Sequence, residues 1–188
     1  MKKLMNGAQM KRIDVYSIQE VGIPSLVLME RAALCVTEAV LEKIKKTDKV
    51  LCVCGSGNNG ADGMAVARQL TERGISAEVY TTAEEGKGTE ELNRQRAILQ
   101  KLGIVFVNDI PAGEYNCIID AVFGIGLSRT ITGRYEQIIE KINAAKDTGS
   151  LIVAVDTPSG INAGDGQVTD PDSAIPETPD SQLPVCTD

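Results

Sequence analysis

Short apolar runs alternate along this chain with longer segments in which apolar residues recur every three or four positions. The runs predict strands at residues 50–54, 77–80, 104–107, 117–122 and 151–155. The periodic segments predict helices at residues 8–20, 25–45, 64–73, 89–102 and 135–145, with Ser25 as the N-cap of the second. Parallel strands need a long crossover connection, usually a helix. We therefore predict an α/β fold, a three-layer sandwich with helices on both faces of a mainly parallel sheet.

The pattern stops after residue 155, and we divide the chain into a folded domain, 1–163, and a tail, 164–188. The tail holds six of the acidic residues, no Lys or Arg, and four of the seven prolines. Such a segment buries too little apolar surface to offset its chain entropy. We expect it to be irregular and exposed, with no strand beside residues 151–155. The sheet would then lack its C-terminal strands, and its last edge would be open or covered by a partner chain.

Composition excludes several classes of function. There is no His, which removes Ser-His-Asp and Cys-His catalysis, and no Trp. The net charge of −7 disfavours binding to a nucleic-acid backbone. No signal peptide or membrane-spanning apolar stretch is evident, so we expect a cytoplasmic protein that binds neither nucleic acid nor membrane. The five cysteines include no C-x-x-C motif, and we interpret them as small buried thiols rather than a disulfide or metal site.

Three polar motifs follow predicted strands. Gly55 to Gly63 is a glycine-rich turn that could cradle a phosphate or could simply be a tight structural connection, and its pattern matches neither G-x-G-x-x-G nor a Walker A loop. Asp120 to Thr130 ends a strand and continues as a loop with glycines, a hydroxyl and a guanidinium. Asp156 to Gly160 follows the last strand and contains a rigid Pro-Ser-Gly turn. Because parallel strands end at one edge of a sheet, we expect these motifs to lie together there.

The same residues resemble the YjeF N-terminal domain family, and within it the NAD(P)H-hydrate epimerases, over roughly residues 5–165. The resemblance rests on four stretches: Leu28 to Ala33, Gly57 to Gly63, Asp120 to Gly126, and Val155 to Gly160. The family's usual Gly-Gly before the aspartate is Gly60-Ala61 here. The resemblance implies a Rossmann-like sandwich, usually a homodimer, that interconverts the R and S epimers of hydrated NADH and NADPH in nicotinamide-nucleotide repair.

The resemblance also implies a set of site residues. Those expected to contact the substrate are Asn58, Asn59, Gly60, Ala61, Asp62, Gly124, Ile125, Gly126, Leu127, Ser128, Arg129, Thr130 and Asp156. Those expected to hold a potassium ion are Asn59, Asp120 and Ser159, whose hard oxygen ligands suit an alkali cation. Since the chain has no His, a carboxylate is the natural acid or base, and we expect Asp156, with Asp62 as the second candidate.

Two further expectations follow from the comparison with that family. Many relatives carry a fused ADP- or ATP-dependent dehydratase domain, so a separate dehydratase is an expected partner. Some relatives with this fold are non-catalytic dimeric scaffolds, and a nucleotide-binding or scaffold module is therefore the alternative function. The presence of Asn59, Asp62, Asp120, Asp156 and Ser159 together favours the enzyme, because a scaffold does not need them.

Overall fold

The computed structural model describes residues 7–127 and 130–161, and its elements follow the predicted order. The helices of this part are α1 (Gly7–Gln19), α2 (Ser25–Leu41), α3 (Asn58–Glu72), α4 (Glu90–Lys101) and α5 (Arg134–Asp147). The strands are β1 (Lys49–Cys54), β2 (Ser76–Thr81), β3 (Phe106–Val107), β4 (Cys117–Ala121) and β5 (Leu151–Ala154). Each predicted strand and helix is present, with differences in some of the ends.

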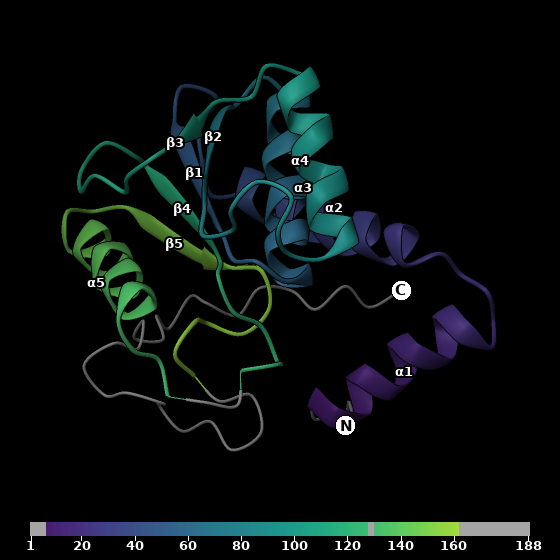
Figure 1. Ribbon diagram of the computed structural model, residues 1–188. Coiled ribbons are helices and arrows are strands. Elements are labelled where there is room, and N and C mark those ends of the chain that lie inside the picture. Colours follow the sequence, from purple (N-terminus) through teal and green to yellow (C-terminus); the bar gives the residue numbers. More distant parts are fainter. Residues whose placement is uncertain (1–6, 128–129, 162–188) are drawn as a thin grey trace, which may run out of the picture.

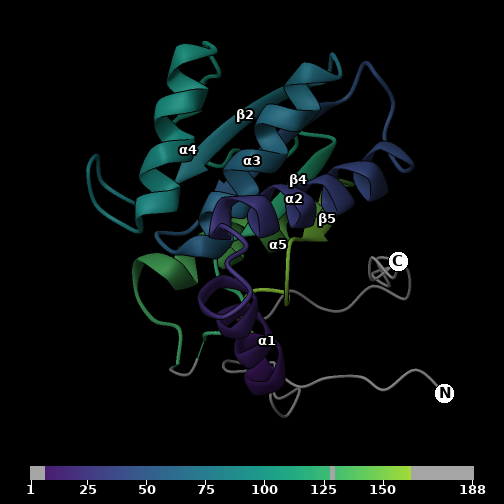
Figure 2. The same ribbon diagram turned by 90° about the vertical axis from the view of Figure 1, so that its right-hand side faces the viewer.

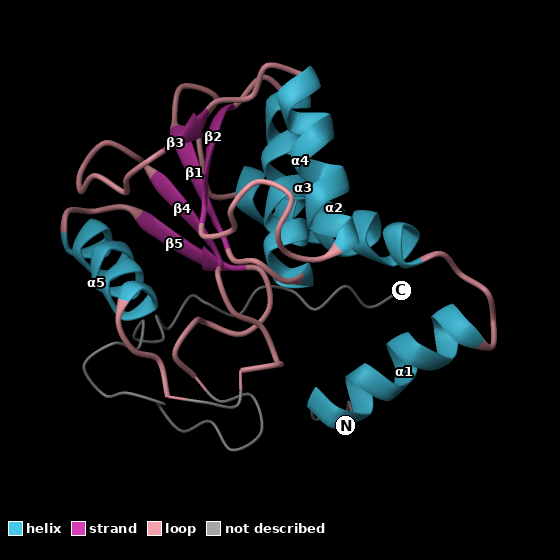
Figure 3. Ribbon diagram, in the orientation of Figure 1, coloured by secondary structure: helices cyan, strands magenta, loops and turns pink. Residues whose placement is uncertain are grey.

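The strands form one parallel sheet, as predicted, and their order in the sheet is β3-β2-β1-β4-β5 (Figure 3). The chain therefore leaves β1 first toward β2 and β3 and later returns to its other side with β4 and β5. This reversal puts the loops that follow β1 and β4 next to each other. Ligands of open α/β sheets bind in the crevice at such a point. Within the described residues β5 is an edge strand; the predicted tail, 164–188, and the proposed boundary before it lie outside them.

Helices cover both faces of the sheet, which confirms the predicted three layers (Figures 1 and 2). Because side chains alternate along a strand, Val50, Cys52 and Cys54 of β1 pack with α2, α3 and α4 on one face. Leu51 and Val53 face the other way and pack with α5. All five of these side chains are fully buried. A strand buried on both faces needs a continuous apolar run, and this is the pattern that β1 shows in the sequence.

The start of α3 differs from the prediction. The sequence predicts a turn through Gly63 and a helix from Met64, but the helix already begins at Asn58. The reason is close packing between the helix and the strand ends. A Cβ on Gly60 would lie 2.0 Å from the carbonyl oxygen of Gly55, and one on Gly63 would lie 2.4 Å from Cβ of Ala121. These glycines let the first turns of α3 press against the sheet, which the glycine-rich composition alone does not reveal.

We predict that Gly60→Ala destabilises the protein by about 1–3 kcal/mol, because the added methyl group has no room against backbone. Gly57→Ala is the matched control, since a Cβ at Gly57 meets nothing within 4 Å and its φ of −102° suits any residue. Urea unfolding of the two variants measures the difference. Equal stabilities would contradict the packing role of Gly60.

Helix α2 also departs from the prediction at both ends. It ends at Leu41 rather than near residue 45. Ser25 is its first residue and caps no backbone N–H; its hydroxyl instead donates to Oε1 of Glu91, 2.8 Å away at the start of α4. A tertiary hydrogen bond thus replaces the predicted local cap. Glu30 has a related role, because its carboxylate accepts from Arg68 of α3 at 2.6 Å and from Gln95 of α4 at 3.2 Å. These bonds hold α2, α3 and α4 together.

The core thiols agree with the sequence prediction in part. Cys52, Cys54 and Cys117 are free and buried in the sheet. Burial and the neighbouring thiols raise the pKa of Cys52 well above its usual value, so it stays neutral. Cys35 differs from the expectation, because it is disulfide-bonded. It lies half-buried on α2 rather than inside the sheet, so its sulfur is not enclosed by the core.

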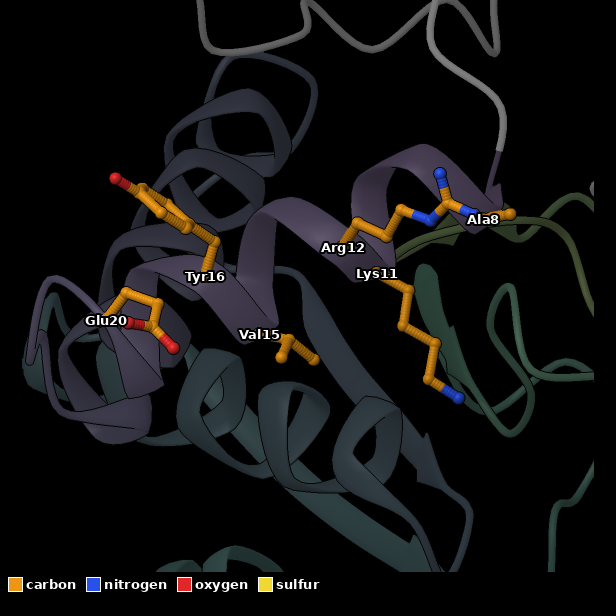
Figure 4. Close-up of a pocket in the computed structure, with 6 residues that line it drawn as sticks. All are labelled: Ala8, Lys11, Arg12, Val15, Tyr16 and Glu20. Carbon is orange, nitrogen blue, oxygen red and sulfur yellow. The ribbon is translucent and has the colours of Figure 1, made fainter.

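Helix α1 stands apart from the three layers (Figures 1 and 2) and has no buried residue. A hollow of about 450 Å³ lies against it (Figure 4). Its lining residues are Ala8, Lys11, Arg12, Val15, Tyr16 and Glu20. None of the site residues predicted from the sequence is among them. No helix in residues 7–127 or 130–161 is both long and apolar enough to cross a membrane.

Candidate functional site

Asp120 and Ser159 form the buried centre of the candidate site. Asp120 is on β4 and Ser159 follows β5, and both side chains are fully buried. The Ser159 hydroxyl donates to Oδ1 of Asp120 at 2.6 Å, and the Ser159 N–H donates to Oδ2 at 2.7 Å. The N–H of Val122 also donates to Oδ1, at 3.2 Å. Burial raises the pKa of Asp120, and the hydrogen bonds from Ser159 and Val122 oppose this rise.

The backbone of Phe123 connects this centre to α3. Its N–H donates to the hydroxyl oxygen of Ser159 at 3.0 Å, and its carbonyl oxygen accepts from Nδ2 of Asn59 at 2.8 Å. Asn59, Asp120 and Ser159, which lie far apart in the sequence, are therefore held around one peptide unit. The amide oxygen of Asn59 is buried and has no hydrogen-bond partner. It is the one acceptor of this trio that the protein leaves free.

Asp156 and Asn59 both approach Gly124. Oδ2 of Asp156 accepts from the N–H of Ile125 at 2.7 Å. A Cβ on Gly124 would lie 2.5 Å from that same oxygen and 3.4 Å from Cγ of Asn59, so only glycine fits between them. Although Asp156 is exposed as a residue, loss of water around its carboxyl group raises its pKa, and the hydrogen bond from Ile125 opposes this.

Asp62 is on the second turn of α3 and has the most clearly altered acidity of the site. Burial raises its pKa to about 7, and the negative charge of Asp156 adds to the rise. A carboxyl group with this pKa can both give and take a proton near neutral pH. The charge of one predicted catalytic aspartate, Asp156, thus acts on the other, Asp62.

The chain matches the sequence profile of the family described as "YjeF-related protein N-terminus" over residues 25–177. The chain belongs to this family. It is similar to proteins named "NAD(P)H-hydrate epimerase" from Limosilactobacillus fermentum, at 40% identity over 89% of this chain and 79% of the relative. It is also similar to one of that name from Oenococcus oeni, at 40% identity over 87% of this chain and 78% of the relative.

The YjeF-related fold is also found in a solved structure. The crystal structure of yeast ynu0 superposes with a TM-score of 0.81, covering 90% of this chain and 76% of the yeast chain, at 24% identity. This likeness concerns the fold. The Rossmann-like α/β sandwich predicted for this member of the YjeF-related family is thereby confirmed.

Some of the residues predicted to contact the substrate lie near Asp120 and Ser159, and two of them lie outside the described residues. Asn58, Gly60 and Ala61 form the first turn of α3. Leu127 and Thr130 line a hollow of about 160 Å³ together with Phe123, Ile131, Thr132 and Tyr135. Ser128 and Arg129 lie outside the described residues, so their predicted contacts stay predictions.

Sequence reasoning missed two contributors to the site. The first is Phe123, which acts through its backbone and so leaves no signal in its side chain. The second is Asp14 of α1, whose negative charge raises the pKa of both Asp62 and Asp156. Helix α1 reaches this edge at its start, where Gly7 packs against Ile125. No spacing in the sequence links α1 to the site, because the two meet only in the folded chain. Within the described residues no group of three or more His, Cys, Asp or Glu side chains is arranged to hold a metal ion.

Proposed function

We propose that this YjeF-related chain is an isomerase that interconverts the R and S epimers of hydrated NADH and hydrated NADPH, in the repair of nicotinamide nucleotides. The observation that carries the proposal is the pair Asp62 and Asp156 at the crevice between β1 and β4, with the pKa of Asp62 raised to about 7. The names of the curated relatives support the substrate. A non-catalytic scaffold would gain nothing from a carboxyl group held near neutrality, and we do not propose that alternative.

The chemistry needs proton transfer but no oxidant. Epimerisation at C6 of the hydrated ring requires the C–O bond to break and a new one to form on the opposite face. The ring nitrogen supplies the electron pair that replaces the lost bond, and the leaving hydroxyl group takes a proton to become water. We assign that proton to neutral Asp62. Asp156, held by the N–H of Ile125, is the base that accepts the proton from the water that returns.

The substrate would lie across the first turn of α3 and the loop after β4. The free N–H groups of Asn58, Asn59 and Gly60 at the start of a 15-residue helix favour the negative pyrophosphate group. Residues 124–130, Ser128 and Arg129 included, would contact the remainder of the dinucleotide. Gly124 keeps the space between Asn59 and Asp156 free of a side chain.

We propose that Asn59, Asp120 and Ser159 hold a potassium ion at this edge. The residues present fit such an ion, because the buried amide oxygen of Asn59 has no partner and the neighbouring groups are a carboxylate and a hydroxyl. A bound cation would add positive charge near Asp62 and Asp156 and help keep the substrate in place.

We predict that Asn59→Ala removes the dependence of activity on potassium, because it deletes the buried amide oxygen that has no hydrogen-bond partner among these three residues. Epimerisation rates are measured from zero to saturating potassium chloride, with sodium chloride keeping the ionic strength constant. Asn93→Ala on α4 is the control, since the Asn93 side chain lies outside the site and donates to the Thr89 carbonyl oxygen of its own helix start at 3.0 Å. Unchanged potassium stimulation in Asn59→Ala would contradict the assignment.

We further propose that the protein is a cytoplasmic homodimer that works with a separate ADP- or ATP-dependent dehydratase. The exposed apolar side chains of α1 support a dimer: Met10, Ile13, Val15, Tyr16 and Ile18 are each at least 37% exposed. An amphipathic helix with no buried residue gains little from its own chain. Within the described residues β5 is an edge strand, and this edge is a second surface that a partner could cover.

The function is tested by mixing the purified protein with the R epimer of hydrated NADH and following the S epimer by chromatography, with and without potassium. Spontaneous epimerisation without protein gives the baseline. A rate no higher than this baseline, from a protein that is folded by circular dichroism, would reject the proposal.

A further inference from the structure

Arg134 is not among the site residues predicted from the sequence, and the proposed proton transfers do not involve it. It is the first residue of α5, directly after Gly133, whose φ of +65° turns the chain into the helix. Its guanidinium donates to the Thr82 carbonyl oxygen at 3.4 Å and to the Tyr80 hydroxyl at 3.3 Å, at the end of β2. The side chain therefore reaches the end of β2, the strand that lies next to β1 in the sheet.

The same contacts bring Arg134 close to the glycine-rich loop. The N–H of Thr82 donates to the carbonyl oxygen of Cys54 at 2.9 Å, and Cys54 is followed at once by Gly55. The guanidinium is therefore one strand away from the loop that leads into α3. A phosphate group at the start of α3 and the guanidinium at the end of β2 would attract each other.

The charge of Arg134 has no carboxylate partner within the residues that the structure describes, where the ion pairs involve other side chains. Both of its acceptors are neutral and both distances are long for a hydrogen bond. Two carboxylates lie nearby. The negative charge of Glu84 helps raise the pKa of Arg134, but Glu84 forms no ion pair with it. Glu136 accepts from the N–H of Gly133 at 3.2 Å. A guanidinium has five donors, so most of those on Arg134 are available to a ligand.

A hollow of about 160 Å³ adjoins this position. Two of the residues that line it, Phe123 and Tyr135, have ring centroids 5.0 Å apart, and Tyr135 is the neighbour of Arg134. The hollow is too small for a whole dinucleotide, since ligand sites usually measure about 300–1,000 Å³. It has room for only a small portion of a ligand whose charged portion lies beside it.

From this geometry we propose that Arg134 binds a phosphate group of the dinucleotide substrate and is a specificity-determining residue of the site. The proposal rests on the proposed function for the identity of the ligand. Two phosphate groups share this chemistry. The pyrophosphate is present in both hydrated cofactors, whereas the adenosine 2′-phosphate is present only in the NADPH form. In dinucleotide-binding sheets the residue that reads the 2′ position lies near the end of the second strand, where Arg134 bonds to Tyr80 and Thr82.

The test measures the binding of ADP and of adenosine 2′,5′-bisphosphate to the full chain by isothermal calorimetry. Arg134→Met removes the charge and keeps an unbranched side chain of similar length. Arg134→Lys keeps the charge but lacks the paired donors with which a guanidinium binds a phosphate group. Arg94→Met is the matched control, an exposed arginine on α4 paired with Glu90 at 3.1 Å. We expect Arg134→Met to weaken binding roughly ten- to a hundredfold, Arg134→Lys to weaken it less, and Arg94→Met to leave it unchanged.

The two probes identify the phosphate. A loss confined to the bisphosphate assigns Arg134 to the 2′-phosphate and predicts that Arg134→Met lowers kcat/KM for hydrated NADPH more than for hydrated NADH. A loss that includes ADP assigns it to the pyrophosphate. Unchanged affinity for both probes in a folded Arg134→Met variant, an equal loss in Arg94→Met, or no binding to the unmodified chain would overturn the proposal. Because calorimetry needs no turnover, a chain that binds these probes through Arg134 without epimerising hydrated NADH would reject the proposed function alone.

Discussion

An Asp62→Asn variant is expected to lose roughly a hundred- to ten-thousandfold in epimerisation rate, because the amide cannot transfer a proton to the leaving hydroxyl group. In the unmodified protein the rate should fall as the pH rises through about 7, where the raised pKa places the loss of the Asp62 proton. The pH dependence of kcat/KM measures this limb of the profile. The Asp62→Asn variant should show no such fall in kcat/KM near pH 7.

The same substitution is expected to stabilise the protein at alkaline pH. The pKa of Asp62 is about 7 in the folded chain against an ordinary value of 3.8, so the folded state holds this proton more tightly than the unfolded state does. Stability from this group is therefore present below about pH 4 and is lost as the pH rises to 7. Asp62→Asn removes the loss, so its melting temperature should exceed that of the unmodified chain at pH 8 and match it more closely at pH 4.

Asp147→Asn, at the exposed end of α5, is the control for both measurements. Full activity in Asp62→Asn would reject its role as the acid. Lower stability than the unmodified chain at pH 8 would contradict the raised pKa of Asp62 on which that role depends.

Replacing Asp120 with alanine is expected to lower the free energy of unfolding by about 3–5 kcal/mol. The carboxylate accepts from the hydroxyl and N–H of Ser159 and from the N–H of Val122, all in a fully buried position. Alanine leaves these three donors without a partner and without access to water. The loop after β5 would also lose its anchor to β4, and with it the position of Asp156.

Two further variants separate this effect from a general loss of charge. Ser159→Ala should cost less than Asp120→Ala, because two N–H donors to the carboxylate are retained. Asp147→Ala should change stability little, since this residue is exposed. Urea unfolding with a constant m-value measures all three. If Asp120→Ala were no less stable than Ser159→Ala, the carboxylate would not be the centre of the site.

The sequence by itself determined the order of the elements, the parallel sheet and the edge at which the polar motifs gather. These depend on local periodicity and on the rule that parallel strands end together, so they can be read from the chain. The meeting of Asn59, Asp120 and Ser159 at one edge follows from the same rule. The family resemblance narrowed the chemistry to epimerisation because four motifs occur in order.

Only the tertiary structure decided the features that depend on contact between distant segments. The early start of α3 at Asn58 requires the helix to press on β1 and β4, and Ser25 bonds to Glu91 rather than to its own helix. The acidity of Asp62 depends on its burial and on the charges of Asp14 and Asp156, which come from opposite ends of the domain. A pKa, a cap or a close approach is set by what lies within a few ångströms, and these neighbours are brought together by the fold rather than by their spacing in the chain.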